Sequence, residues 1–447
     1  MRKDRGDFVM GKTDILFAFD TEDFTSNDAA DAIYREAEIL RSEGVRGGFC
    51  VVGLVAKQLL NWGRYDVISS LKYHDILSHS LSHSIHPTLH EYTDIEDFDA
   101  AYSEVLAKET EGLELISKIT DGRSIIGACP PGNQKNYVAM YAYADMGLPI
   151  YADTVCDTPD GRGAYYCNIY HTQYSFGMEN FFADCSDEYM KKSLDNLASH
   201  KRVICFTHPN AAMFSEFWDS VNYFRENSCE FGKWKECKRR PLEETERYYE
   251  SIKRFIKHIK ADDRFNITSF AELKAELEKK MPRVIKKEDI PFIRECLKTE
   301  LAPIDNPSFS ISDIFLSTVD FLLGKEEHIC SKVYGFLDTP YSLDEETVLT
   351  KDDIISAAKS INTDKFLPTE IYAGNKKIGP ADFLMAALDV LCGEESARLI
   401  PRVQLPSLDI MPRLRDVKFK GGWIQSDSFE DRFISKRLRL QCWTMRF

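Results

Sequence analysis

Short apolar runs alternate with helix-like segments over the first 280 or so residues of the chain. Each run ends at a polar cluster or at glycine or proline, as buried strands do. The runs cover residues 15–19, 48–53, 124–129, 148–152, 203–207 and 265–268. Apolar residues recur at helical spacing over residues 27–43, 95–118, 136–146 and 242–260. Repeated strand–helix units predict an α/β fold with a parallel sheet or barrel, whose functional residues follow the strands.

The pattern changes after residues 280–290, a basic segment without apolar periodicity. Two apolar helices are predicted beyond it, over 311–324 and 378–393, and each follows a loop that contains proline. Their Phe-Leu pairs lie 68 residues apart (315 and 383). This spacing fits a degenerate two-copy helical repeat, and it fits two unrelated buried helices equally well.

These patterns divide the chain into three parts. We predict an α/β domain over residues 1–283, a smaller, mainly helical domain over 284–400 and a C-terminal tail over 401–447. The tail is short of helix signals, and we expect it to form strands or to pack back on the first domain. Each of the two domains is long enough to bury a core.

Charge and hydropathy narrow the classes of partner. A net charge of −15 argues against nucleic acid or an anionic membrane as the main partner, because both need a basic surface. No uncharged apolar run approaches the roughly 20 residues of a spanning helix. The first residues lack the apolar stretch of an export signal, and the twelve cysteines are scattered without a CxxC pair. A cytoplasmic location with reduced thiols is therefore expected.

Histidines and carboxylates cluster in two places that suit a metal ion. Five of the ten histidines are His74, His79, His83, His86 and His90. The i, i+4 spacing of His79 and His83 can place both imidazoles on one face of a helix or tight turn. Asp20-Thr21-Glu22-Asp23 follows the first apolar run, and one carboxylate from it would complete a catalytic type of site. A solvated polar segment and an acidic helix N-terminus are the alternatives.

A further histidine, His208, directly follows the apolar run 203–207 and precedes Pro209. Catalytic residues of α/β sheets and barrels lie at such strand ends. A capping or core histidine fits the same pattern.

Taken in order, these features resemble the NodB-type polysaccharide deacetylases, a carbohydrate-esterase family with a distorted (β/α) barrel. The matching segments are FDTED (19–23), HSLSH (79–83), the proline-rich CPPGN (129–133) and FTHP (206–209). The run GFCVVG (48–53) is also similar to a strand of that family. The resemblance covers about 280 residues, and it implies a distorted barrel of this type followed by the smaller helical domain.

The resemblance also implies roles for individual residues. Asp20 corresponds to the general base and His208 to the general acid. His79 and His83 correspond to the imidazole ligands of a divalent metal ion. The carboxylate ligand would be Glu22 or Asp23, and Glu22 is favoured, although the extra residue relative to an adjacent Asp-Asp pair leaves the choice open. Zn²⁺ is the expected ion, with Co²⁺, Ni²⁺ and Mn²⁺ as alternatives.

The proline-rich loop corresponds to part of the substrate site. Its residues here are Pro130, Pro131, Gly132 and Asn133. Backbone N–H groups near this loop would help to hold the oxyanion of the tetrahedral intermediate. The chain departs from the family pattern next to this loop. Cys129 occupies the place of the family's arginine, which orients the catalytic aspartate.

Three functions follow as hypotheses. The first is a metal-dependent hydrolase that removes N-acetyl groups from a carbohydrate or glycoconjugate. The second is a hydrolase of small amides or cyclic imides on the same fold. The third is a catalytically weakened, glycan-binding pseudoenzyme, suggested by Cys129 and by the segment 353–391, which is similar to a pseudomurein-binding repeat.

Overall fold

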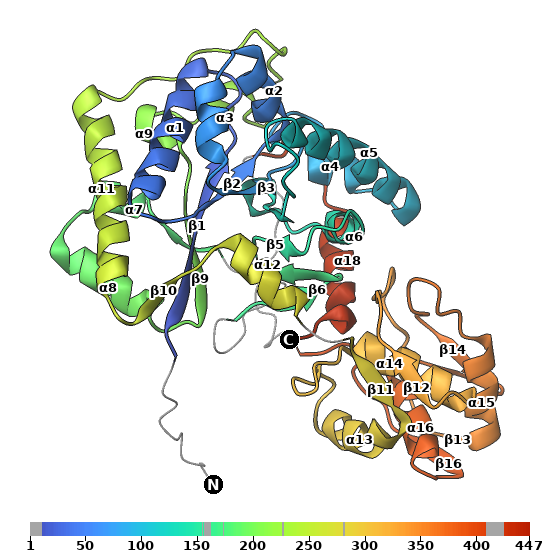
Figure 1. Cartoon of the computed structure of the whole chain (residues 1–447). Helices are drawn as coiled ribbons and strands as arrows, with labels where there is room; N and C mark the ends of the chain where they lie inside the picture. Colours follow the sequence, from blue (N-terminus) through green and yellow to red (C-terminus); the bar gives the residue numbers. More distant parts are fainter. Residues whose placement is uncertain are drawn as a thin grey trace.

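A curled, mostly parallel sheet organises the first part of the chain (Figure 1). The computed structural model describes residues 11–153, 155, 162–172, 174–225, 228–279, 282–407 and 424–447. The strands are β1 (Thr13–Thr21), β2 (Gly48–Val51), β3 (Asp75–Ser78), β4 (Gly127–Ala128), β5 (Ile150–Tyr151), β6 (Ala164–Tyr166), β7 (Ile169–His171), β8 (Tyr174–Gly177), β9 (Arg202–Thr207) and β10 (Phe265–Ile267).

The strand order in this sheet is β6-β7-β5-β4-β3-β2-β1-β9-β8, and β10 also pairs with β1. All of these pairs are parallel except β6 with β7. Within the described residues, β6 and β8 do not pair with each other, so the sheet forms an open half-barrel. The predicted α/β fold with a distorted barrel is thus confirmed.

Helices cover the outer face of this sheet and close one end of it. They are α1 (Asn27–Ser42), α2 (Gly53–Asn61), α3 (Tyr65–Leu71), α4 (Leu89–Thr93), α5 (Phe98–Ser117), α6 (Tyr137–Asp145), α7 (Asn180–Ala183), α8 (Asp187–Leu197), α9 (Asn210–Met213), α10 (Trp218–Asn222), α11 (Leu242–Ala261) and α12 (Phe270–Glu278). Phe270, Leu273 and Leu277 of α12 pack against the inner face of the sheet.

The alternation of side chains along β1 separates two apolar layers. Phe17 and Phe19 belong to the layer between the sheet and the outer helices. Leu16 and Ala18 belong to the interior of the half-barrel. Because side chains two apart in a strand share a face, Asp20 continues the inner series at the strand's carboxyl end. The sequence therefore places a carboxylate at the mouth of the half-barrel.

The second part contains two units, each with a first strand, two helices and a last strand, and the second unit also has a hairpin between its helices. The first unit is β11 (Val284–Lys286), α13 (Ile290–Thr299), α14 (Ile311–Leu322) and β12 (Glu327–Ile329). The second is β13 (Thr347–Thr350), α15 (Lys351–Ser360), the hairpin β14 (Ile371–Ala373) and β15 (Lys376–Ile378), α16 (Pro380–Leu391) and β16 (Ser396–Leu399). In each unit the first and last strands pair antiparallel.

The apolar helices predicted for this part are α14 and α16, and they pack on each other with the rings of Phe315 and Phe383 5.5 Å apart. The short strands were not predicted, because three or four residues with exposed alternate positions give too little apolar signal. The two-copy repeat and the domain boundaries stay predictions.

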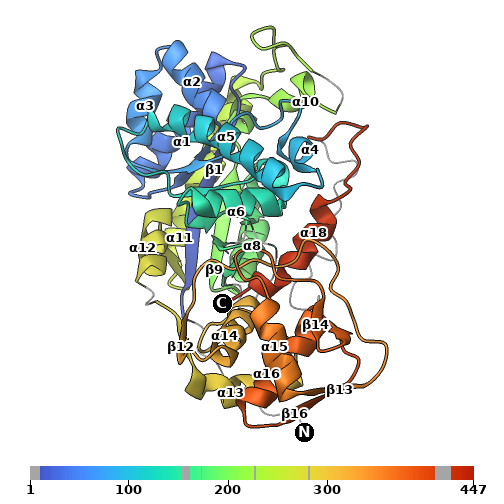
Figure 2. The ribbon, with the colours of Figure 1, turned by 90° about the vertical axis from the view of Figure 1, so that its right-hand side faces the viewer.

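For the C-terminal tail we expect strands or a segment packed back on the first domain, and the described residues 424–447 contain a helix that contacts the first part. Residues 434–440 form α18 (Ile434–Leu440), followed by a 3-10 turn, η4 (Gln441–Thr444). Figure 2 shows α18 running between the sheet and the helices of the second part. One apolar core extends from α5 and α6 through α18 and Trp443 to α14 and α16. The two parts are therefore held together by a shared core. No helix in the described part of the chain has the length and apolarity that a membrane span requires.

Asp94, just after α4, caps the N-terminus of α18 across this junction. Its carboxylate accepts hydrogen bonds from the backbone N–H groups of Arg432 (2.8 Å), Phe433 (2.7 Å) and Ile434 (3.1 Å). Asp94 is buried, and a carboxylate at a helix N-terminus also interacts favourably with the helix dipole.

Replacing this cap should loosen the junction. We expect Asp94→Ala to lower the free energy of unfolding by about 3 kcal/mol, because buried N–H groups would lose their acceptor. Urea-induced unfolding measures the change. Asp338→Ala is the control, since Asp338 is exposed and pairs with Lys436 only at 3.5 Å; it should cost less than about 0.5 kcal/mol. Equal effects of both substitutions would contradict the capping role.

Candidate metal centre

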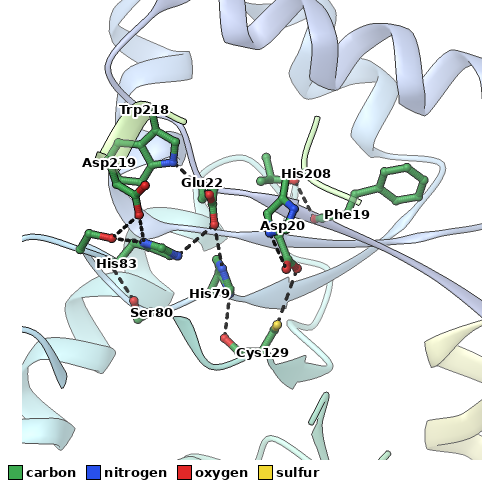
Figure 3. Close-up of polar contacts among 12 residues, drawn as sticks. Phe19, Asp20, Glu22, His79, Ser80, His83, Cys129, His208, Trp218 and Asp219 are labelled. Atoms are coloured by element: carbon green, nitrogen blue, oxygen red, sulfur yellow. Dashed lines mark hydrogen bonds and ion pairs between the residues drawn. The ribbon is translucent and has the colours of Figure 1, made fainter. Parts of the chain in front are cut away.

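The residues singled out in the sequence meet at the carboxyl edge of the sheet (Figure 3). The sheet runs β4-β3-β2-β1-β9 in this region, and every neighbouring pair is parallel. The carboxyl ends of these strands therefore lie on the same side. Asp20 lies at the end of β1, and His79, Cys129 and His208 directly follow β3, β4 and β9. Four segments that are distant in the sequence thereby contribute to one site.

Glu22, His79 and His83 offer ligand atoms that all lie within 4.8 Å of one another. The Glu22 Oε2 atom is 3.3 Å from His79 Nε2 and 2.9 Å from His83 Nε2. The two histidines are brought together by a tight turn in which Ser80 and His83 have positive φ angles of 66° and 50°. Of the two arrangements that the i, i+4 spacing allows, a helix and a tight turn, the structure has the tight turn. All three side chains are buried.

Hydrogen bonds behind the rings determine which ring nitrogen faces Glu22. His79 Nδ1 lies 2.9 Å from the Cys129 carbonyl oxygen, so this nitrogen must carry the proton and donate it. Ser84 Oγ donates to Asp219 (2.8 Å) and therefore accepts from His83 Nδ1 at 2.6 Å. In the neutral rings, both Nε2 lone pairs then point at a carboxylate oxygen.

Three acceptors that converge in a buried space need a cation between them. Either protons on both rings or a divalent ion satisfies this requirement, and imidazole with carboxylate is a typical ligand set for Zn²⁺. Burial alone would raise the pKa of Glu22, but the facing His83 and His79 hold it well below the usual value. Burial alone would lower the pKa of His79, but the negative charges of Asp20 and Glu22 outweigh burial, so the pKa of His79 is raised. The donor set fits a metal ion.

A second layer of side chains fixes the ligands. Trp218 Nε1 donates to Glu22 Oε1 at 3.0 Å, which leaves Oε2 directed at the histidines. Burial and the nearby Glu22 raise the pKa of Asp219 to about 7. Such outer partners set the orientation and basicity of metal ligands. Trp218 and Asp219 were not predicted from the sequence, because they carry no local motif and lie 196 residues beyond Glu22 and 135 residues beyond Ser84, respectively.

Asp23, the other predicted carboxylate ligand, is directed elsewhere. Its Oδ1 atom accepts from the Thr25 N–H (2.8 Å) and hydroxyl (2.7 Å) groups in the turn before α1. Burial raises its pKa to about 6. Asp23 does not belong to either group of converging ligand atoms found in the described residues. Of the two candidates, the structure brings Glu22 to the histidines.

Asp20 lies on the opposite side of His79 from His83, between a thiol and an imidazole (Figure 3). The Cys129 Sγ atom is 3.6 Å from Asp20 Oδ1, and His208 Nε2 is 3.6 Å from Asp20 Oδ2. Asp20, His79 and Cys129 also form a second group of atoms close enough to hold an ion. The thiol therefore occupies the place expected of the arginine, and His208 supplies a cationic neighbour when it is protonated.

Glu179 supports His208 from behind. Its Oε1 atom accepts from the His208 backbone N–H (2.8 Å) and from Nδ1 (2.7 Å). Burial alone would lower the pKa of His208, but the bond to Glu179 and the charges of Glu22 and Asp20 raise it to about 10. A divalent cation nearby would reduce this value by repulsion. Glu179 was not predicted, because it lies in a short turn after β8 and belongs to no sequence motif.

The predicted substrate loop forms a 3-10 turn, η1 (Pro131–Asn133), directly after Cys129. Gly132 and Asn133 are exposed, and both have φ angles of 55°. The backbone N–H groups of Asn133 and Gln134 donate to the carbonyl oxygens of Pro130 (3.3 Å) and Pro131 (3.1 Å). These two amides are thus used within the turn, and the role of the loop in substrate binding stays a prediction.

Two of the other clustered histidines have structural roles. His74 is buried, and its ring bonds to the Gly47 N–H (3.2 Å) and the Ala37 carbonyl (3.0 Å). His86 faces the Glu91 carboxylate (2.8 Å) with one nitrogen and the Tyr223 carbonyl (3.1 Å) with the other, which requires a protonated ring. Only His79 and His83 of the five reach Glu22.

No protein-family model and no curated protein matches the chain. Among solved structures, the chain is similar to a protein described as a polysaccharide deacetylase from Mycobacterium smegmatis (17% identity, TM-score 0.41, 62% of this chain and 95% of the other covered). It is also similar to an allantoinase (11%, 0.40, 62% and 93%) and to a CE4-family pseudoenzyme from Bacillus anthracis (12%, 0.36, 59% and 66%). Similarities at these TM-scores carry no weight for function, which has to rest on the chain's own geometry.

The converging acceptors predict that the purified chain binds one divalent ion. Titration calorimetry with Zn²⁺ and the visible spectrum with Co²⁺ should both report one site per chain. We expect His79→Ala and Glu22→Gln to weaken binding by more than about 100-fold, since loss of an outer partner alone costs 10–100-fold.

Two matched variants serve as controls for metal binding. His200→Ala removes a half-buried imidazole that belongs to neither group of converging ligand atoms, and Asp23→Asn removes the carboxylate that faces Thr25. Both should bind the ion as the unmodified chain does. If Asp23→Asn abolished binding while Glu22→Gln did not, the assignment of the carboxylate ligand would be wrong.

Proposed function

We propose that this chain is a metal-dependent hydrolase that removes N-acetyl groups from a carbohydrate or glycoconjugate. The observation that carries the proposal is the two-sided site. Glu22, His79 and His83 form one side, where a cation is required. Asp20 and His208 form the other side, where a proton can be taken up and another delivered. The sequence resemblance to the NodB-type deacetylases supports the same chemistry.

The metal-binding side would be formed by Glu22, His79 and His83. A divalent ion held there would polarise the acyl carbonyl and lower the pKa of water toward about 7. Trp218 donates to Glu22, while Ser84 and the Cys129 carbonyl accept from His83 and His79. These outer hydrogen bonds keep the three ligands oriented.

Asp20 is the group placed to accept a proton from the attacking water. It lies at the mouth of the half-barrel, and its exposed fraction is only 7%, so little bulk solvent competes for it. His208 Nε2 faces the same carboxylate. Glu179 accepts from Nδ1–H and stabilises the imidazolium, in which Nε2 also carries a proton. It can deliver that proton to the departing nitrogen, which leaves poorly as an anion.

The Cys129 thiol beside Asp20 favours a second candidate function, a weakened enzyme that mainly binds glycans. A thiol supplies no fixed positive charge, so it stabilises the aspartate less than a guanidinium would. Acetate release by the unmodified chain distinguishes the two functions. A hydrolase of small amides would instead act on ureides and leave N-acetyl sugars intact.

Removing either proton-transfer group should abolish most of the activity. We expect Asp20→Asn and His208→Ala to lower kcat for acetate release from N-acetylated sugar oligomers by 10²–10⁴-fold, or about 3–5 kcal/mol of barrier. Metal content should be unchanged in both variants, because neither group belongs to the Glu22–His79–His83 set. Rates equal to that of the unmodified chain would remove both residues from the mechanism.

The alkaline limb of the pH profile of kcat should follow the pKa of His208, which Glu179 raises. The proton donor is active below its pKa, so the rate should fall as pH rises through that value. Glu179→Gln removes the negative charge that stabilises the imidazolium, which lowers the His208 pKa and should move the alkaline limb of kcat to lower pH. Glu188→Gln, an exposed glutamate on α8, should leave the profile in place. An unmoved limb in Glu179→Gln would show that His208 does not produce it.

A further inference from the structure

A cavity of about 870 Å³ lies at the junction of the two parts, away from the metal centre. Its walls come from β6, from the start of β11 and the loop before α14, and from the last two residues of the chain. Both overall views place the C-terminus at this junction (Figures 1 and 2). The volume falls within the range of about 300–1,000 Å³ that is usual for small-molecule sites. None of the metal-centre residues lines it.

Positive charge predominates on the cavity wall. Arg283, Lys286, Lys332 and Arg446 line it, and the acidic side chains on the wall are Glu288 and Asp289. Three of the four cations have acidic partners. Arg283 pairs with Asp313 at 2.5 Å, Lys286 lies 3.7 Å from Glu288, and Lys332 pairs with Asp145.

Arg446 differs from the other three cations. No carboxylate in the described part of the chain forms an ion pair with it. Its guanidinium lies over the Tyr165 ring, 3.4 Å from the centroid, and its backbone pairs with that of Tyr165 (2.8 and 3.1 Å). These contacts hold the guanidinium plane in one orientation. Burial and the neighbouring Arg283 lower its pKa to about 10.

Arg446 is half-buried, and Asp313, which pairs with Arg283, is also the carboxylate that acts on Arg446. Two guanidinium groups that share one carboxylate keep a net positive charge, which an anion in the cavity would offset. Phosphate suits this arrangement best, because guanidinium groups bind its oxygens through paired, charge-assisted hydrogen bonds. Leu277, Val284 and Phe309 also line the cavity, so its wall has an apolar part beside the cations.

We propose that this junction cavity is a second site, which binds a phosphate-bearing small molecule through Arg446 and Arg283. The site is separate from the metal centre and does not depend on the proposed hydrolase activity. Because its walls come from both parts of the chain, an occupied site would also add contacts across their junction.

Calorimetric titration of the full-length chain in metal-free buffer tests the site. The probes are inorganic pyrophosphate, adenosine diphosphate and glucose 6-phosphate, which separate a bare phosphate group from a nucleotide and from a sugar phosphate. Glucose is the neutral control. We expect saturable binding of at least one phosphate probe at one site per chain, a rise in Tm with that probe, and no binding of glucose. Absence of saturable binding by all three phosphate probes would overturn the proposal.

Arg446→Gln should weaken the binding of that probe at least tenfold and remove the rise in Tm. Arg439→Gln is the matched control, because Arg439 is exposed on α18, carries the same charge and does not line the cavity. Equal loss of affinity in both variants would overturn the proposal. Near-UV circular dichroism reports whether Arg446→Gln is folded. If it is not, Lys286→Gln decides: affinity reduced several-fold supports the site, and unchanged affinity refutes it.

Discussion

The convergence of two imidazole lone pairs on one carboxylate oxygen is the constraint on which the rest of the site depends. Neutral imidazoles and an ionised carboxylate repel one another in a buried space unless a cation lies between them. The geometry follows from the sheet, because parallel pairing through β2 places the carboxyl ends of β1 and β3 at the same edge. The Cys129 carbonyl and the Ser84 hydroxyl then determine the tautomers. Fold and hydrogen bonding together create a place for positive charge.

The C-terminal tail supports the same region from outside the half-barrel. Glu91 accepts hydrogen bonds from the Ser426 N–H at 2.6 Å and from protonated His86. Burial alone would raise the pKa of Glu91, but these hydrogen bonds outweigh burial and lower it to about 2. Asp94 caps α18 a few residues later. The loop that follows the histidine turn is therefore tied to the last helix of the chain. A shared apolar core makes the second part a structural extension of the first.

The sequence predicted the fold class and the main site, because each depends on local patterns. Apolar runs marked β1, β2 and β9, and the i, i+4 histidines marked the turn after β3. The choice between Glu22 and Asp23 also has a local cause, since Glu22 lies two residues after Asp20 and shares its face of the chain. The period of the strand, continued beyond its last apolar residue, gives a physical reason for the preference for Glu22.

Other parts of the site could not be predicted, because they depend on long-range contacts. Glu179, Trp218 and Asp219 lie on short turns and helices without a motif, and only the closed fold brings them to His208, Glu22 and Ser84. The position of the Cys129 thiol beside Asp20 depends on the pairing of β3 with β4. The helix α18 was missed because it spans only seven residues, of which three are apolar, and so short a segment gives a weak periodic signal.

X-ray absorption spectroscopy at the zinc edge tests the central claim most directly, since it reports the atoms bound to the ion in the full-length chain. The account predicts two imidazole nitrogens and one carboxylate oxygen from the protein, with the imidazole signal lost in His83→Ala. A spectrum with sulfur from Cys129 in the coordination shell, or with no imidazole contribution, would contradict it.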